Sequence, residues 1–415
     1  MGSRDAKMLT FLTEYFYPEE SSTAQLLTEL AVELSESYDV SAVTNLPNYH
    51  DIDQHKAVSK RERHEDVSVR RLRGTRFDKD SLVLRIVNWL SFTLLTTLHL
   101  ARRQTDVLLV VSNPPILPFA AWVKKRVSGT PYVYLIHDMY PDMPIGLGIL
   151  SEDSLIARIW ERGMRILYRD ADRIVVLGGS MEDRLVEKMG ADAGFDPEKV
   201  SVIPNWEDEE FIQPMAKTKN EFAAEQGTRE KFTVLYSGNI GRFHELKTVI
   251  DAIDILEKQG REDIELLIIG EGARKEELIQ YVTESDVKNI RFLPFQPRDR
   301  LPETLTCADA SLVGIKPEME GMCVSSKLYS SLAAGMPVLA VVGESDEVAR
   351  VVREESCGEY ISPSDAEKAA KTIALWADNP AEVSRYGQNA RTALENNYTK
   401  AHAVEAYESL LSDII

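Results

Sequence analysis

Cysteine is scarce in this sequence, with 3 among 415 residues. Cys307, Cys323 and Cys357 form no CxxC pair and show no paired Cys/His spacing typical of metal ligands. A disulfide framework is therefore excluded, and a reducing compartment, the cytoplasm, fits this usage best. We also expect no metal cofactor, because no set of ligating side chains is recognisable.

Long uncharged apolar runs are absent as well. The first residues, MGSRDAKMLTFL, contain no apolar region of the length found in signal peptides. The best membrane candidate, 81–101, is interrupted by Arg85 and Asn88. Fewer residues remain than the roughly 20 that a spanning helix needs. We predict a buried or interfacial helix here.

Positive charge is also in short supply. The formal net charge is −19 at pH 7. Residues 1–205 carry 25 Lys and Arg against 29 Asp and Glu, so most of the excess acidity lies in the second half. A polyanion such as DNA would be repelled, which disfavours nucleic-acid binding. Such acidity is also compatible with a high-salt organism.

Apolar runs and helical patterns alternate along the first half of the chain, which is typical of a parallel sheet covered on both faces. The expected strands are 8–12, 40–44, 67–72, 107–111, 132–136, 174–177 and 200–203. Helical periods are expected at 23–36, 82–101, 116–127, 155–169 and 180–189.

The same alternation then begins again. The expected strands are 232–236, 264–269, 290–293, 310–313, 338–342 and 359–361. The expected helices are 246–259, 274–284, 300–307, 326–334, 345–355, 365–378, 380–395 and 402–414. A polar stretch at 207–231 lacks strong periodicity and is interpreted as the linker. The length suits two domains of about 200 residues each.

We therefore predict an α/β protein with two Rossmann-like, doubly wound parallel-sheet domains facing a cleft. Ligands of such sheets bind beyond the carboxyl ends of the strands. Functional residues are accordingly sought in the loops that follow strands.

Two such loops belong to the first half. Residues 13–25, TEYFYPEESSTAQ, lead from a strand into a helix whose N-terminus favours an anion. An ordinary turn with a serine cap is the competing interpretation. Residues 134–144 place His137 and Asp138 at a strand end, where they could orient a sugar or an acceptor hydroxyl. A structural histidine is the alternative, and no Ser/His/Asp constellation can be assembled.

Three further loops belong to the second half. YSGNIGRFHELK, residues 236–247, combines close-approach glycines with Arg242, a side chain suited to phosphate oxygens. LLIIGEGARKEEL, residues 266–278, lacks the third glycine of the dinucleotide fingerprint and is interpreted as a tight turn. Residues 312–340 place Glu320 before a helix that opens near Ser326 and Lys327. A carboxylate there can accept sugar hydroxyls while the helix N–H groups hold a diphosphate, or it can simply be solvated.

In this order, the segments resemble the retaining glycosyltransferases of family 4, which have the GT-B fold. The resemblance spans nearly the whole chain and includes TEYFYPEESSTAQLLTELA, LIHDMYPD, DRIVVLGGSMEDRL, VSVIPNW, YSGNIGRF, LLIIGEG and SSKLYSSLAAGMPV. The opening and the SKLY element look most like the branch that builds exopolysaccharides and lipid-linked glycans. The resemblance implies an acceptor-binding domain at 1–206 and a donor-binding domain at 207–395. The final helices are expected to return to the first domain, to which 396–415 are assigned.

The resemblance also assigns residues. It implies that Arg242 neutralises the donor diphosphate and that Glu320 contacts the donor sugar. His137 and Asp138 match a loop that faces the transferred sugar and the acceptor, and with Arg242 and Glu320 they are the catalytic candidates. The companion lysine of the family falls on His244 or on Lys247, depending on the alignment. The implied donor-binding residues are Gly238, Asn239, Gly241, His244, Lys247, Gly270, Gly272, Phe295, Val324, Ser325, Ser326, Lys327 and Ser330.

Ser21 and Ser22 match a loop facing the transferred sugar and the acceptor. Ser330 stands where the family has a second glutamate that holds the ribose, and a hydroxyl is a weaker anchor than a carboxylate. The expected reaction is transfer of a sugar from a UDP- or GDP-sugar to a hydroxyl, by front-face attack that needs positioned charge rather than a side-chain nucleophile. An NDP-sugar epimerase and a non-catalytic partner subunit are the alternatives.

A basic segment precedes the apolar stretch 81–101. Its members are Lys56, Lys60, Arg61, Arg63, Arg70, Arg71, Arg73 and Arg76. Basic side chains beside an apolar helix suit an anionic membrane surface, although a solvated face beside a core helix explains them equally well. We predict peripheral contact with the cytoplasmic membrane face through 56–101, with a polyprenyl-phosphate-linked acceptor.

Overall fold

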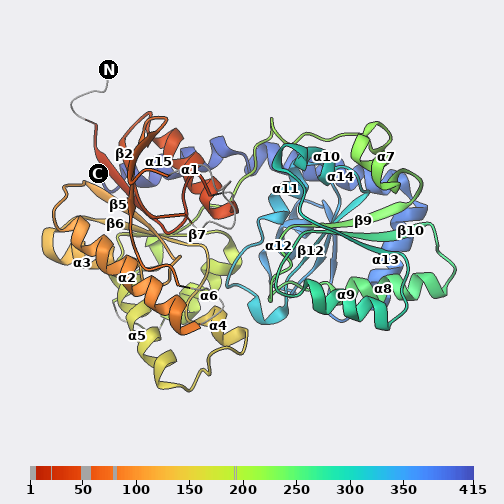
Figure 1. The fold of residues 1–415 in the computed structure, drawn as a ribbon, viewed down its shortest axis with the longest axis horizontal. Helices are drawn as coiled ribbons and strands as arrows, with labels where there is room; N and C mark the ends of the chain where they lie inside the picture. Colours follow the sequence, from red (N-terminus) through yellow and green to blue (C-terminus); the bar gives the residue numbers. More distant parts are fainter. Residues whose placement is uncertain (1–5, 20, 48–57, 78–81, 191, 193) are drawn as a thin grey trace. The chain divides into compact units, whose positions relative to one another are not determined.

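The computed structural model describes residues 6–19, 21–47, 58–77, 82–190, 192 and 194–415 (Figure 1). The chain divides into two compact units. The first comprises Met1–Pro204 with Ala401–Ile415, and the second comprises Asn205–Lys400. Each unit has its own sheet, and the architecture is the predicted α/β arrangement of two parallel-sheet domains.

The first unit contains an 8-stranded sheet of order β3-β4-β2-β1-β5-β6-β7-β8. Its strands are β1 (Met8–Leu12), β2 (Asp39–Asn45), β3 (Arg61–His64), β4 (Val67–Leu72), β5 (Val107–Val111), β6 (Tyr132–Ile136), β7 (Arg173–Val176) and β8 (Val200–Val202). Its helices are α1 (Ser22–Leu34), α2 (Leu82–Leu100), α3 (Pro118–Ser128), α4 (Asp142–Gly146), α5 (Leu155–Asp170), α6 (Gly179–Met189) and α15 (Lys400–Ser412).

The central strands of this sheet are buried because helices cover both of its faces. Every residue of β5 and β6 is buried, as expected for near-continuous apolar runs in a parallel sheet. Helices α1 and α15 lie on one side, and α2, α3 and α5 lie on the other (Figure 1). The charged strand β3 was missed, because RERH has no apolar run. It pairs antiparallel with β4 at the sheet edge.

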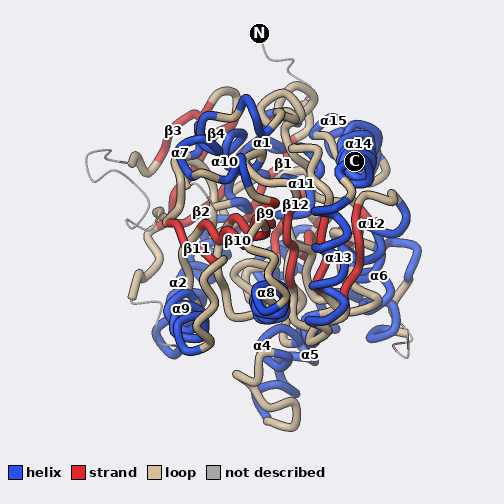
Figure 2. The backbone as a smooth tube through the Cα atoms, turned by 90° about the vertical axis from the view of Figure 1, so that its right-hand side faces the viewer, coloured by secondary structure: helices blue, strands red, loops and turns tan. Residues whose placement is uncertain are grey.

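The second unit contains a 6-stranded parallel sheet of order β11-β10-β9-β12-β13-β14. Its strands are β9 (Phe232–Ser237), β10 (Ile264–Ile269), β11 (Ile290–Leu293), β12 (Ala310–Gly314), β13 (Val338–Val341) and β14 (Gly358–Ile361). Its helices are α7 (Glu221–Gln226), α8 (Lys247–Lys258), α9 (Lys275–Glu284), α10 (Leu301–Leu305), α11 (Lys327–Ala333), α12 (Glu347–Glu354), α13 (Ala366–Asp378) and α14 (Pro380–Asn397). Figure 2 shows β11, β10, β9 and β12 following one another across this sheet.

The core of the second unit lies between the sheet and helices α8 and α13. Val234 and Tyr236 of β9 and Ile253 of α8 are buried in it, together with Trp376 of α13. Each fully buried large apolar side chain contributes about 1.5–3 kcal/mol. The two final helices separate: α14 belongs to the second unit, and almost all of α15 to the first, where Ser37 donates a hydrogen bond to Glu408 at 2.6 Å.

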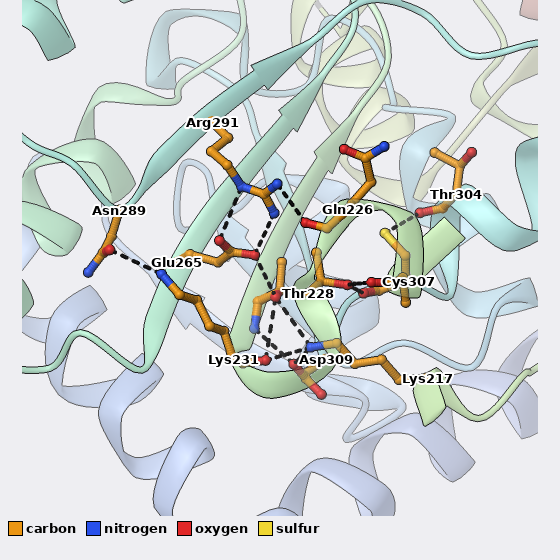
Figure 3. A network of polar contacts seen from close by, with 12 residues as sticks. Lys217, Gln226, Thr228, Lys231, Glu265, Asn289, Arg291, Thr304, Cys307 and Asp309 are labelled. Atoms are coloured by element: carbon orange, nitrogen blue, oxygen red, sulfur yellow. Dashed lines mark hydrogen bonds and ion pairs between the residues drawn. The ribbon is translucent and has the colours of Figure 1, made fainter. Parts of the chain in front are cut away.

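The polar stretch 207–231 is not a loose linker, which corrects that interpretation. It folds against the amino ends of the second sheet's strands, as Figure 3 shows. Lys217 pairs with Asp309, and the Thr228 hydroxyl donates to the carbonyl oxygen of Cys307 at 2.7 Å. Polar side chains that lack periodicity therefore serve as anchors here, and periodicity alone could not reveal them.

Candidate functional site

The order in which successive strands join the second sheet reverses between β9 and β12. Strands β10 and β11 extend from β9 on one side, and β12 to β14 extend on the other. Ligands of doubly wound sheets bind beyond the carboxyl ends of the strands at such a switch point. The loop after β9 carries Arg242, and the loop after β12 carries Glu320 and leads into Lys327. The strongest sequence candidates thus meet the topological requirement.

Three glycines let the loops after β9 and β10 approach each other. Gly238, Gly270 and Gly272 have φ values of 132°, 151° and 150°, a region that side-chain-bearing residues rarely adopt. A Cβ added to Gly270 would lie 1.9 Å from the carbonyl oxygen of Gly238. A Cβ on Gly272 would lie 2.5 Å from that of Ile240. These predicted donor-site glycines are required by backbone packing.

Lys327 reaches back from α11 to the loop after β9. A Cβ on Gly238 would lie 2.7 Å from Lys327 Cε, and Lys327 Nζ lies 3.2 Å from Nε2 of His244. His244 is buried, and its Nδ1 accepts a hydrogen bond from the Gly241 N–H at 2.9 Å. Burial lowers the pKa of Lys327 to about 8. Burial, helped by the nearby Lys327 and Arg274 cations, lowers the pKa of His244 to about 2.

His244 and Lys247, the two candidates for the companion lysine of the family, have different surroundings in the structure. His244 lies beside Lys327, whereas Lys247 begins α8 and lies 4.2 Å above the ring of Tyr281. Arg242 is exposed, and no ion pair described here includes it. The loop after β9 therefore offers one exposed guanidinium, and α11 supplies the nearby amine.

Glu320 lies against the loop that follows β13. It comes directly after the short turn Pro317–Met319, and a Cβ on Gly343 would lie 1.8 Å from its Oε2. Asp346 is buried in the same loop and caps α12 by accepting the Val348 N–H at 2.9 Å. Burial, with smaller contributions from Glu320 and Glu347, raises the pKa of Asp346 to about 7. Sequence reasoning missed this second carboxyl group.

Ser330 has a carboxylate beside it that sequence reasoning also missed. Its hydroxyl donates to Glu207 Oε2 at 2.6 Å. The Glu207 N–H donates to the carbonyl of Tyr398 at 3.1 Å, which fixes the backbone that carries this side chain. No pattern in the sequence relates positions 207 and 330. Their proximity depends on how the segment after β8 packs against α11.

The remaining predicted donor-site residues differ in exposure. Val324 and Ser325 are buried, Ser326 is half-buried directly before α11, and Asn239 precedes the turn to Gly241. Phe295, in the loop after β11, is 54% exposed. Its ring is therefore accessible to a ligand.

In the first unit the corresponding switch point lies between β1 and β5. The loop after β6 lies close to this point, because the backbone N–H groups of His137 and Asp138 both donate to Ser112 Oγ at 3.1 Å. Burial lowers the pKa of His137 to about 4 and raises the pKa of Asp138 to about 6. His137 is therefore neutral at pH 7.

The serine pair has a partly structural role. Ser21 caps α1 by accepting the Ala24 N–H at 3.3 Å, as the alternative interpretation of this loop held. Ser22 is the first residue of α1, and both side chains are exposed. Capping uses an acceptor lone pair of Ser21 and does not prevent its hydroxyl from meeting a ligand.

One side chain of the basic segment is buried in the protein and does not lie on its surface. Arg71 is buried and donates to Glu62 at 2.6 Å and to the carbonyl oxygens of Ser59 and Tyr17, so its assignment to a membrane surface was wrong. Arg61, Arg73 and Arg76 are exposed. Lys56 lies outside the described residues. Within the described ranges, no three His, Cys, Asp or Glu side chains gather to hold a metal ion.

Comparison with known families identifies this arrangement. Residues 23–206 match the model of the glycosyl transferase 4-like domain, and residues 218–393 match that of the glycosyl transferases group 1. Together the two models account for most of both units. The chain belongs to the family 4 glycosyltransferases, with the GT-B fold, and is a glycosyltransferase.

Individual proteins agree with this. The chain is 27% identical over 75% of its length to WbjE of Pseudomonas aeruginosa, described as a glycosyltransferase, and covers 76% of that protein. It is 29% identical to WcaI of Escherichia coli, described as a colanic acid biosynthesis glycosyl transferase, over 51% of each chain. The solved structure of Anabaena HepE with UDP-glucose has a similar fold, with a TM-score of 0.73, 15% identity, and coverage of 98% and 99% of the two chains.

Proposed function

We propose that this enzyme transfers a sugar, with retention of configuration, from a UDP- or GDP-sugar to a hydroxyl of a polysaccharide or lipid-linked glycan intermediate. The observation that carries the proposal is that exposed Arg242, in the loop after β9, and Lys327, at the start of α11, both belong to the segments at the switch point of the second sheet. Positive groups at this position suit a diphosphate. The UDP-glucose bound to HepE and the name of WcaI support the donor and acceptor classes.

In this proposal the cations of the protein, and no metal ion, stabilise the leaving group. The acceptor oxygen forms a bond to the anomeric carbon as the bond from that carbon to the β-phosphate oxygen breaks. The acceptor proton passes to the departing phosphate oxygen, and attack on the same face retains the configuration. Arg242 and Lys327 stabilise the negative charge that develops on the departing diphosphate. Electrostatic stabilisation of this kind is usually the largest single contribution to catalysis.

Carboxylates complete the proposed site. We assign Glu320 to the donor sugar and the Glu207–Ser330 pair to the nucleoside, since a carboxylate beside Ser330 offers the strong hydrogen-bond acceptor that a serine alone lacks. His137 and Asp138 are assigned to the acceptor side, where a neutral imidazole can donate or accept a hydrogen bond.

A panel of nucleotides tests the proposed function. UDP or GDP at 100 times its dissociation constant should stabilise the protein by about 2.7 kcal/mol, seen as a rise in the melting temperature. ADP serves as the comparison ligand. Absence of stabilisation by UDP, GDP and ADP would exclude donor binding and favour the non-catalytic partner subunit.

We further propose that α2 and α5 rest on an anionic membrane surface, where a lipid-linked acceptor would be found. Ile86, Leu90, Leu94 and Leu98 recur every fourth residue along α2 and are 40%, 56%, 60% and 54% exposed. The opposite residues Phe92, Thr96 and Leu100 are buried. A continuous exposed apolar ridge of this kind is typical of an interaction surface.

Helix α5 extends this surface. Leu155, Ile156 and Ile159 at its start are 72%, 66% and 61% exposed, and Arg158 and Arg162 follow on the same helix. Both helices cover the same side of the first sheet (Figure 1). None of the helices described by the structure is long and apolar enough to cross a membrane.

The Leu90→Glu/Leu94→Glu double variant tests this contact. It is expected to lose most of its co-sedimentation with anionic vesicles, because each exposed leucine contributes up to about 1.5–3 kcal/mol when it is buried in lipid. Leu375→Glu, on α13 of the second unit and 55% exposed in the wild type, is the matched control. Equal sedimentation of the double variant and the control would rule out α2 as the contact.

A further inference from the structure

The contact between Lys327 and His244 constrains where their protons lie. The Gly241 N–H points at Nδ1 of His244 at 2.9 Å, so Nδ1 is the accepting nitrogen. In a neutral imidazole the proton is then on Nε2. Lys327 Nζ lies 3.2 Å from Nε2. An ammonium group only donates hydrogen bonds. This contact is therefore favourable only when Lys327 is a neutral amine that accepts a hydrogen bond from the Nε2–H of His244.

The surroundings of Lys327 act in both directions. Burial is the largest influence and favours the amine. The ring of Tyr236, from β9, lies 5.2 Å from Nζ, and this ring and Cys323 favour the ammonium to a smaller extent. Arg274, in the loop after β10, donates to the His244 carbonyl at 2.8 Å and is ion-paired with Glu277. None of the ion pairs described here includes Lys327. Burial therefore lowers its pKa to about 8, without an opposing carboxylate.

We propose that His244 is a positioning residue that favours the neutral amine form of Lys327 in the empty site, and that in mildly alkaline solution binding of a nucleoside diphosphate draws up to one proton from solvent onto Lys327. The proposal rests on the proposed function, because an anion must occupy the site. The proton adds to the lone pair of Nζ, the ammonium then donates to a diphosphate oxygen, and the proton returns to solvent when the nucleotide leaves. Donor binding thus weakens as pH rises.

Thermodynamic linkage between nucleotide binding and protonation of Lys327 gives the direction of the pH dependence. An anion that binds the protonated form raises the pKa of Lys327, so proton uptake is greatest above the pKa of the empty site. For an empty-site pKa of about 8, uptake should be about 0.5 proton per nucleotide at pH 8 and about 0.9 at pH 9. UDP affinity should be about tenfold weaker at pH 9 than at pH 7.

Isothermal titration calorimetry with UDP and GDP, in buffers of different ionisation enthalpy, measures this uptake directly. Above pH 8 the terminal phosphate of the nucleotide, with a pKa near 6, is fully ionised and contributes no proton. Lys327→Arg carries a permanent charge, so it should bind without proton uptake and with an affinity that is flat from pH 7 to 9. Lys258→Met, an exposed lysine on α8, should behave as wild type.

His244→Ala separates positioning from general structural support. Loss of the Nε2 donor should return the pKa of Lys327 toward its ordinary value, so uptake at pH 8 should fall well below half a proton while UDP still binds. Wild-type binding with no proton uptake at pH 8 would overturn this inference and leave the proposed function intact. No heat with UDP or GDP at any pH would overturn both. Proton uptake measured on the wild-type protein tests this inference even if a variant fails to fold.

Discussion

Replacement of Arg242 by alanine is expected to weaken nucleotide binding strongly. The exposed guanidinium is the charge that the loop after β9 presents at the switch point, and its loss leaves diphosphate oxygens without a bidentate donor. Truncating one partner of a desolvated charge pair costs about 2–5 kcal/mol. This corresponds to a dissociation constant weaker by roughly 30-fold or more.

Titration calorimetry with UDP and GDP checks this result. Arg385→Ala is the matched control, because Arg385 is also exposed and its only ion pair described here is with Glu382, at 3.6 Å on the same helix. The control should bind as wild type does. Wild-type affinity in Arg242→Ala would show that the diphosphate is held elsewhere, and the donor-site assignment would fail with it.

Replacement of Glu320 by alanine is expected to affect chemistry rather than binding. Its carboxylate packs on Gly343 and lies near Asp346, which places it in the loops that follow β12 and β13. A group that contacts the sugar only as charge develops should lower turnover by about 10²–10³-fold when it is removed. Nucleotide affinity should change little.

The measurement is release of nucleotide from UDP-glucose and GDP-mannose, beside UDP and GDP binding. Glu318→Ala, two residues earlier and exposed, should retain both properties. Gly343→Ala should reproduce part of the Glu320→Ala effect, because its Cβ would meet the carboxylate at 1.8 Å. Equal loss of binding and turnover in Glu320→Ala would mean that Glu320 holds the nucleotide instead.

The order of strands and helices could be predicted from the sequence. Runs such as VLLVV and YVYLI are apolar on both faces, and only a sheet covered on both sides buries such strands. Loop placement followed, because ligands of these sheets bind beyond the carboxyl ends of the strands. The strand β3 was missed because its charged residues sit at a sheet edge, where burial imposes no apolar pattern.

By itself, then, the sequence determined the two-sheet architecture, the family resemblance and the loops that carry Arg242, Glu320 and Lys327. Only the tertiary structure decided which side chains meet: His244 with Lys327, Ser330 with Glu207, and Arg71 with the interior of the first unit. The reason is physical. Periodicity reports which face of an element is buried, whereas contacts between residues far apart in the chain depend on how whole elements pack.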